Sequence, residues 1–305
     1  MGLVRKSVLL AAVAISAATM AAPGAFAQFD RGPQVNRKDV DPVIGAAADV
    51  MGLVRTRALV IGQINLPSYD AKGTMVDLEA ATPGQPLTLT KYSYHMAFYF
   101  PAAREEIEAG NLKVSRVVKG TRAWDETWVT DAKGNKTKIN TAPADKFATF
   151  RAQMMWFQPH NWLQAAALLS TKKGIDGKAS TDTLTVAKEN GKDTVSVPIK
   201  GVVYKGTMGA DKRPESIEAT ITMPDGSKKK MVAKFTDWRA GEKPDAGYSQ
   251  ALGANALDQF HNGTYFPSKI VHELDGAKVM DLTLTAGWGN PYVVFPEPEL
   301  LAKGQ

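Results

Sequence analysis

The sequence predicts an α+β fold, mostly β, in which one large curved antiparallel sheet forms an open half-barrel with a few helices on its concave face. Three observations support this prediction. Most of the chain consists of short segments in which polar and apolar residues alternate, which is the pattern of half-buried strands. Tight-turn sequences such as Asn190-Gly191 and Asp275-Gly276 separate these segments. Helical periodicity is confined to three stretches, so we expect the helices to share one face of the sheet.

The first 27 residues have the pattern of a secretory signal peptide. Arg5 and Lys6 precede an apolar run, and Ala25-Phe26-Ala27 supplies the small residues of a cleavage site. We expect cleavage after Ala27 and a periplasmic or secreted mature protein. No second apolar stretch of about 20 residues follows, so no transmembrane span is expected in the mature form. The chain has no cysteine, which excludes disulfides and thiolate chemistry.

The charge of the chain does not favour nucleic-acid binding. The formal net charge is +6, and removal of Arg5 and Lys6 with the signal leaves +4. Nucleic-acid binding needs basic residues gathered into a stripe. The one dense run, Lys228-Lys229-Lys230, lies in a predicted hairpin, where exposed lysines protect a strand. We therefore expect no nucleic-acid partner.

The mature chain begins with a lead-in and continues as a single domain. Residues 28–42 are polar and contain Pro33 and Pro42, which predicts an extended or disordered segment. Residues 43–305 are assigned to one domain with the predicted sheet. Its first element is an amphipathic helix over residues 43–54, because Ile44, Met51 and Val54 follow helical spacing.

After this helix, apolar residues recur at every second position in many short segments, and this spacing predicts strands. Turn sequences such as Pro224-Asp225-Gly226 join neighbouring strands, which indicates a meander. The predicted strands lie within eight segments: 58–67, 72–80, 86–100, 111–130, 182–200, 215–239, 264–274 and 278–289.

Two groups of acidic residues, one of them beside Trp124 and Trp128, are interpreted as exposed to solvent. Asp125 and Glu126 are adjacent in a strand and therefore point to opposite faces, which disfavours a catalytic pair of carboxylates. Trp124 and Trp128 are expected to pack. A solvated loop is predicted for three further glutamates: Glu105, Glu106 and Glu108.

The second helical stretch covers residues 145–170, and the third covers residues 245–260. Pro159 suits a first helical turn, and "NWLQAAALLS" after it is almost without charge. A helix that is apolar nearly all round is either core or the wall of an apolar pocket. The candidate lining of a hydrophobic cavity is Trp156, Phe157, Trp162, Leu163, Ala166 and Leu169, with Met51 and Val54 from the first helix.

Several short blocks in this order resemble a known family. They are "RVVKGTRAWDE", "RAQMMWFQPHNWLQAAAL", "TYFPSKIVHELDGAKVMDLTLT" and "NPYVVFPEPELL". The pattern resembles the N-terminal accessory domain of exported metallo-β-lactamase-fold hydrolases, with a lipoprotein-carrier-like (LolA-like) fold, over about residues 45–299. The resemblance implies an antiparallel half-barrel that holds helices and an apolar cavity. Asn161 and Trp162 depart from it, because the family has Gly and Phe there.

No hydrolase domain accompanies these blocks, and no catalytic or metal-binding motif is present. The chain has His95, His160, His261 and His272, no two of which are closer than eleven residues, so the H-x-H-x-D-H motif of such hydrolases is missing. Phosphate-binding, dinucleotide and G-x-S-x-G motifs are missing as well. We expect no catalytic residues, no metal and no cofactor. His160 is interpreted as a structural histidine near a helix start.

Three functions remain open. The first is a non-catalytic exported protein that binds a hydrophobic ligand, such as a lipid or acyl chain. The second is an interaction module whose partner is an exported hydrolase. The third is an unrecognised hydrolase that uses His160 or His261. The C-terminal segment with Pro291, Pro296 and Pro298 is interpreted as an extended strap across the sheet, and alternatively as a docking rim.

Overall fold

A computed structural model describes residues 33–54, 59–62, 64, 66–80, 84–98, 100–110, 112–131, 133, 136–242, 263–289, 295–296 and 298. All of them belong to one compact unit, Gly32–Gln305. The predicted signal peptide, the predicted helix over residues 245–260 and His261 lie outside the described residues. In the described part of the chain, no helix is both long and apolar enough to cross a membrane.

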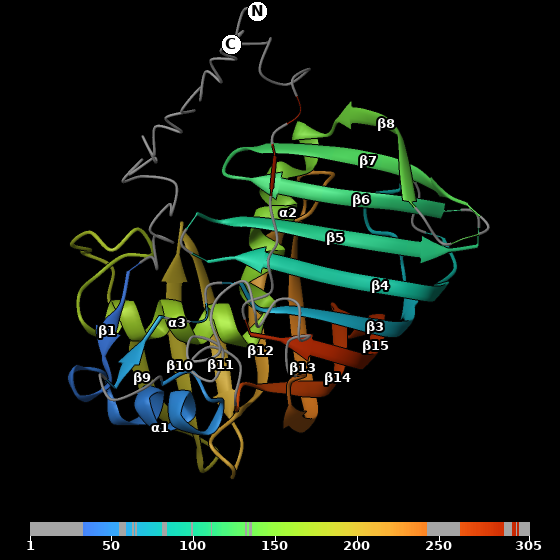
Figure 1. Cartoon of the computed structure of the whole chain (residues 1–305). Helices are drawn as coiled ribbons and strands as arrows, with labels where there is room; N and C mark the ends of the chain where they lie inside the picture. Colours follow the sequence, from blue (N-terminus) through green and yellow to red (C-terminus); the bar gives the residue numbers. More distant parts are fainter. Residues whose placement is uncertain are drawn as a thin grey trace, which may run out of the picture. The chain divides into compact units, whose positions relative to one another are not determined.

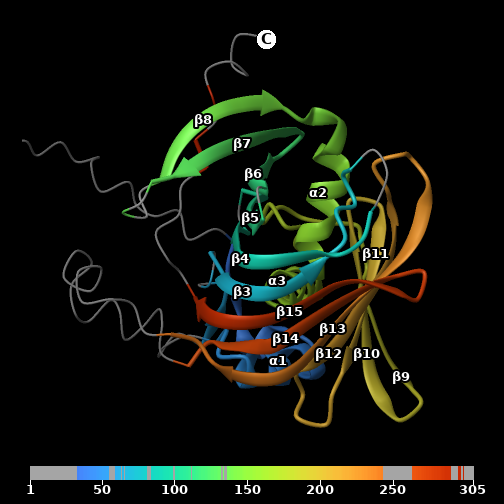
Figure 2. The same ribbon diagram turned by 90° about the vertical axis from the view of Figure 1, so that its right-hand side faces the viewer.

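The predicted antiparallel sheet is confirmed. Within the described residues, thirteen strands pair in the order β8-β7-β6-β5-β4-β3-β15-β14-β13-β12-β11-β10-β9, and the sheet curves without closing into a barrel (Figures 1 and 2). Two meanders therefore meet where β15 pairs with β3. The first meander comprises β3 (Ser68–Met75), β4 (Leu87–Ala97), β5 (Ala102–Ala109), β6 (Leu112–Lys119), β7 (Arg122–Thr130) and β8 (Lys136–Pro143). The second comprises β9 (Thr185–Glu189), β10 (Lys192–Ile199), β11 (Val202–Met208), β12 (Pro214–Thr222), β13 (Lys228–Ala240), β14 (Tyr265–Leu274) and β15 (Ala277–Trp288).

The hairpin turns have the backbone conformation that their sequences predict. Asn190 and Gly191 have φ angles of 49° and 79°, and Asp275 and Gly276 have 49° and 84°. Two positive φ angles in succession define the type I′ turn, whose twist matches that of the flanking strands. Lys200 and Gly201 have the same geometry, with φ angles of 49° and 80°, although Lys-Gly is a weaker turn signal.

Three α-helices and three 3-10 turns accompany the sheet in the described chain. The helices are α1 (Pro42–Val50), α2 (Ala148–Met154) and α3 (Pro159–Ser170), and the 3-10 turns are η1 (Arg37–Asp39), η2 (Asp145–Phe147) and η3 (Met155–Phe157). The predicted helix over residues 145–170 is therefore broken. Gln158 leaves the helical conformation, with ψ at 122°, because the proline ring of Pro159 disfavours that conformation in the residue before it.

The predicted lead-in is part of the fold from Val35 onward. Strand β1 (Val35–Asn36) pairs with β2 (Val60–Ile61), and η1 follows directly. Helix α1 begins at Pro42, where the Asp41 side chain accepts a hydrogen bond of 2.8 Å from the backbone N–H of Val43. This N-cap explains why the helix begins there.

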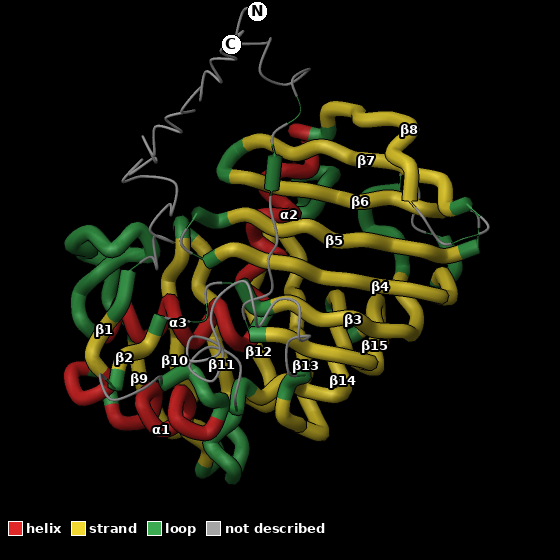
Figure 3. The backbone as a smooth tube through the Cα atoms, in the orientation of Figure 1, coloured by secondary structure: helices red, strands yellow, loops and turns green. Residues whose placement is uncertain are grey.

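The helices occupy the concave side of the sheet, as predicted (Figures 2 and 3). Helix α2 contacts β5, β6 and β7 and also β12, whereas α3 contacts β10 and is in turn covered by α1. The two inner helices thus divide the concave side into two regions. We call the part that α2 covers, over β5, β6, β7 and β12, the α2 region, and the part that α3 covers, over β10, the α3 region.

Candidate functional site

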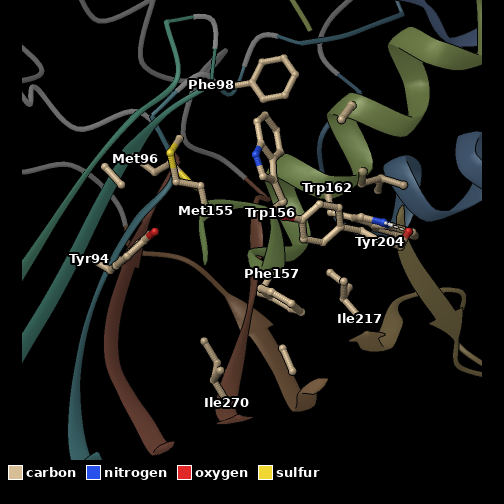
Figure 4. Close-up of a cluster of buried hydrophobic side chains, with 14 of the residues drawn as sticks. Tyr94, Met96, Phe98, Met155, Trp156, Phe157, Trp162, Tyr204, Ile217 and Ile270 are labelled. Carbon is tan, nitrogen blue, oxygen red and sulfur yellow. Dashed lines mark hydrogen bonds between the residues drawn. The ribbon is translucent and has the colours of Figure 1, made fainter. Parts of the chain in front are cut away.

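The residues predicted to line a cavity around α3 lie in the packed core. Figure 4 shows Trp156, Phe157 and Trp162 among other buried side chains. Seven of the eight predicted residues are at most 3% exposed, and Val54 is partly exposed. These seven are Met51, Trp156, Phe157, Trp162, Leu163, Ala166 and Leu169.

The Trp162 ring lies directly on the backbone of β11. Its Nε1 donates a hydrogen bond of 3.2 Å to the carbonyl of Tyr204. A Cβ atom added to Gly206 would lie 2.2 Å from Trp162 Cζ2, so the ring occupies the space that only glycine leaves free. The α3 region is therefore filled by protein at this point.

His160 has a structural environment. Its Nε2 donates a hydrogen bond of 2.8 Å to the carbonyl of Tyr265, and its ring lies 4.5 Å from that of Phe266 between centroids. Burial lowers the pKa of His160 to about 4, so the imidazole is neutral at pH 7. The hydrogen bond links α3 to β14.

A cavity lies in the α2 region, between α2 and the middle of the sheet. Its volume is about 70 Å³, and none of the eight residues predicted from the sequence lines it. Four methionines contribute much of its apolar wall: Met75, Met154, Met231 and Met280. Six residues give it a polar wall: Glu79, Glu105, Arg116, Arg151, Gln158 and His272.

Strand register aligns part of the polar wall in one row. Tyr69, Tyr94, Glu105, Arg116 and Asp125 are directly paired from β3 to β7, each with the next. Residues that pair across antiparallel strands share a face of the sheet. The row therefore crosses the concave face beneath α2. The prediction of a solvated loop for Glu105, Glu106 and Glu108 is wrong, because all three lie in β5.

Arg151 of α2 connects the helix to this row and to the loop after β3. Its Nε and Nη2 donate hydrogen bonds of 2.7 and 2.6 Å to the two carboxylate oxygens of Glu79. A further bond of 2.6 Å goes to Asp125, and Nη1 bonds the carbonyls of Val117 and Trp124 at 3.1 and 3.0 Å. These bonds use all five N–H donors of a guanidinium group.

Arg116 is less completely bonded. Its Nη2 donates a hydrogen bond of 2.8 Å to Asp77, and its Nε lies 3.3 Å from Glu79 in an ion pair. That Nε–H has no partner with hydrogen-bond geometry in the described chain. Burial by itself would lower the pKa of Arg116, but the neighbouring Glu79 and Asp77 carboxylates raise it, so the guanidinium is charged.

Two tyrosines, Tyr92 and Tyr94, form the next part of the wall, and Tyr69 packs against both. The rings of Tyr69, Tyr92 and Tyr94 are stacked, with centroids 5.7 to 6.5 Å apart. Burial raises the pKa of all three hydroxyl groups, so they are neutral. The Tyr92 hydroxyl donates a hydrogen bond of 2.8 Å to Glu105, and Gln158 Nε2 donates one of 3.1 Å to the Tyr69 oxygen. Burial also raises the pKa of Glu105.

His272 of β14 completes the polar wall. The residue is 3% exposed, and its Nε2 has no hydrogen-bond partner among the described residues. Burial lowers the pKa of His272 to about 4, so this imidazole is neutral as well. A buried polar atom without a partner is costly and calls for an explanation.

The expectation that Asp125 and Glu126 are solvated is wrong. The two carboxylates do point to opposite faces, and both neighbouring tryptophans are buried, but neither acid is free in solvent. Glu126 is 8% exposed and accepts hydrogen bonds from Arg104 and from Trp124 Nε1, at 3.0 and 3.2 Å. The arginine partners are far away in sequence, so the local pattern does not reveal these pairs.

Three residues at the end of the predicted C-terminal strap lie within the described chain, Phe295, Pro296 and Pro298, and Phe295 is buried. Phe295 packs in a small convex-face core and is 5% exposed, with its ring 5.8 Å from that of Phe100. This contact favours the strap over a docking rim at Phe295. The lysine run of residues 228–230 lies in β13, an interior strand of the sheet, so it does not protect a sheet edge.

A second hollow is larger but is lined mainly by partly or fully exposed side chains. This groove of about 450 Å³ lies where β12 begins and β13 ends, and Arg213, Lys234 and Trp238 contribute to it. Its cations already have exposed acidic partners: Arg213 pairs with Asp211, and Lys234 with Glu273. We therefore take the smaller cavity, with its buried polar groups, as the candidate site.

The candidate site carries no metal-binding cluster. In the described part of the chain, no group of three or more histidine, aspartate or glutamate side chains is arranged to hold an ion. The sequence signal for this site was the alternation in "KYSYHM" and "AREEIE", which places every second residue on one face, among them Tyr92, Tyr94 and Glu105. Comparison with known proteins adds no relative, because no family model and no curated protein matches the chain.

Proposed function

We propose that the protein is an exported, non-catalytic carrier that binds a hydrophobic ligand, such as a lipid or acyl chain, in the cavity beneath α2. The observation that carries this proposal is the lining of the cavity by four methionines next to a buried polar wall. Small-molecule sites are usually apolar with a few placed polar groups. The signal peptide and the resemblance to a lipoprotein-carrier-like domain support export and this class of ligand.

The cavity must widen to hold such a ligand. Its volume of about 70 Å³ lies below the ordinary range of ligand pockets, roughly 300–1,000 Å³. Methionine side chains are unbranched and adapt to irregular shapes, so the wall can repack around a chain. Met154 is partly exposed on α2, and movement of its side chain would enlarge the opening.

The structure gives less support to the other two functions. Three large apolar side chains are strongly exposed in the described chain, Leu59, Val129 and Val203, and they belong to different elements. A partner module would present them together. A hydrolase could use His272 and Glu105, which share the cavity, but no serine, threonine or cysteine lines it.

The test is native mass spectrometry of the mature protein purified from the periplasm, followed by organic extraction. We expect bound lipid on the wild type and on Met154→Leu, which keeps the volume and the apolar character of the wall. Met154→Glu places a charge in the wall and should remove the ligand. Circular dichroism shows whether each variant is folded. A folded wild type without any ligand, which also fails to bind added acyl compounds, would refute the carrier function.

A further inference from the structure

We infer that the cavity binds the uncharged carbonyl group of an acyl ester or amide and discriminates against the free carboxylate of the same chain. The inference rests on the proposed function and specifies its ligand. It follows from three properties of the polar wall: its charge balance, its unused hydrogen-bond donors and the position of Glu105 between Arg116 and Tyr94.

The charge balance disfavours an anionic ligand. Two guanidinium groups reach the wall, those of Arg116 and Arg151. Three carboxylates contact them, Asp77, Glu79 and Asp125, at 2.6 to 3.3 Å. The cluster therefore has one negative charge more than positive charges, even when Glu105 is protonated. A ligand carboxylate would add like charge to a poorly hydrated site, where repulsion is strong.

The unused donors favour a carbonyl oxygen. Arg151 has no N–H left, whereas Arg116 makes a single hydrogen bond in addition to its ion pair with Glu79. His272 Nε2 has no partner in the described chain, and in the tautomer with its proton on Nε2 it is a donor. A carbonyl oxygen accepts from such groups without bringing a charge, and so removes the cost of leaving them unpaired.

Glu105 adds a group that responds to the ligand. It lies directly opposite Arg116 on one side and Tyr94 on the other, and Tyr92 donates to its Oε1. In its protonated form the carboxyl group donates a hydrogen bond from its other oxygen, and in its ionised form it repels an anion. The ionised form therefore discriminates against an anion, and the protonated form offers a donor to a carbonyl oxygen. The methionines beside it would surround the acyl chain.

The experiment is displacement of the neutral fluorescent probe N-phenyl-1-naphthylamine from the mature protein at pH 8. The competitors are methyl decanoate and decanoate, which share one chain and differ in charge. We expect methyl decanoate to bind at least about tenfold more tightly than decanoate, because the carboxylate meets excess negative charge. Equal or tighter binding of decanoate would overturn the inference and leave the carrier function standing. Failure of both compounds to bind would overturn both.

Two variants test the assigned groups. His272→Phe should weaken binding of methyl decanoate by about fivefold or more, because one buried hydrogen bond is lost. His160→Phe is the matched control, since it removes an equally buried neutral imidazole outside the cavity, and the affinities should stay as in the wild type. Equal effects of the two substitutions would contradict the role of His272. Glu105→Gln is nearly isosteric and should reduce the preference for the ester by improving decanoate binding; an unchanged preference would contradict the role of Glu105.

Discussion

The α3 region and the α2 region lie under the same sheet but are filled in different ways. In the α3 region, a helix without a charged residue packs on the strands so closely that Trp162 rests on Gly206. In the α2 region, Arg151 enters the interface with its ion pairs, and a cavity remains beside it. The difference shows that apolar character in a sequence locates the packed core, whereas buried charged groups surround the candidate site.

The largest expected effect is in the α2 region. Arg151→Met should lower the free energy of unfolding by about 3–5 kcal/mol, because it leaves the carboxylate of Glu79 buried without its main partner. Urea unfolding measures the loss. The double variant with Glu79→Leu removes both charges and should recover a large part of it. A loss of under about 1 kcal/mol for the single variant would mean that the buried ion pairs do not hold α2 on the sheet.

The two buried histidines, His160 and His272, allow the two regions to be compared through the pH dependence of the free energy of unfolding. Both pKa values are lowered to about 4, from 6.5, so the unfolded chain binds more protons between these values. The two neutral imidazoles contribute fully to the free energy of unfolding above about pH 6.5. As the pH falls toward about 4, this contribution is lost, by up to about 1.4 kcal/mol per pH unit for each histidine.

Urea unfolding at pH 7.5 and pH 5 measures this dependence for the wild type, His160→Phe and His272→Phe. Glu105, whose raised pKa acts in the opposite direction, is present in all three proteins and cancels in the comparison. Each substitution should flatten the dependence. A bound ligand should alter the pH dependence of the His160→Phe variant more than that of His272→Phe, since His272 lines the cavity and His160 does not. An equal response of both variants would place the ligand elsewhere.

An intermediate effect is expected for the close packing in the α3 region. Gly206→Ala should cost about 1–3 kcal/mol, since its Cβ would lie 2.2 Å from the Trp162 ring, which must move. Gly84→Ala is the matched control, because a Cβ there has no atom within 4 Å. Thermal unfolding of both variants gives the difference. If Gly206→Ala is as stable as the control, the α3 region has more free space than the structure shows.

The smallest effect is expected for an ion pair on the surface. Lys234→Ala removes the partner of Glu273, and the two side chains are 50% and 25% exposed. We expect a loss of less than about 1 kcal/mol, because water screens the pair and the free side chains have more entropy. A loss as large as that of Arg151→Met would show that burial is not what distinguishes the two pairs.

Much of the fold could be predicted from the sequence, because its signals are local. Alternation and turn residues such as Asn190-Gly191 reveal strands and hairpins within a few residues. Strand β5 was missed, since its glutamates resemble a solvated loop, although Glu105 faces the cavity. The break at Gln158 follows a local rule for the residue before proline, yet the apolar periodicity around it favoured one helix.

The candidate site could not be predicted in the same way, because its pairs join distant parts of the chain. Arg151 and Glu79 are 72 residues apart, and Arg116 and Asp77 are 39 apart. Apolar character directed the prediction to Trp162 and Leu163, which fill the core. A buried Arg or Glu gives no local sign of its partner, so only the paired strands bring the site together.

The pairing of β15 with β3 has a consequence for the order in which the chain acquires its structure. Met75 and Met280 face each other across these strands, and both line the cavity. Neighbouring hairpins of either meander can form early, whereas this contact must wait until β15 has been synthesised. A chain truncated before β15 would lack the cavity even if its hairpins formed. Binding in this cavity would therefore report that the two meanders have joined at β15 and β3.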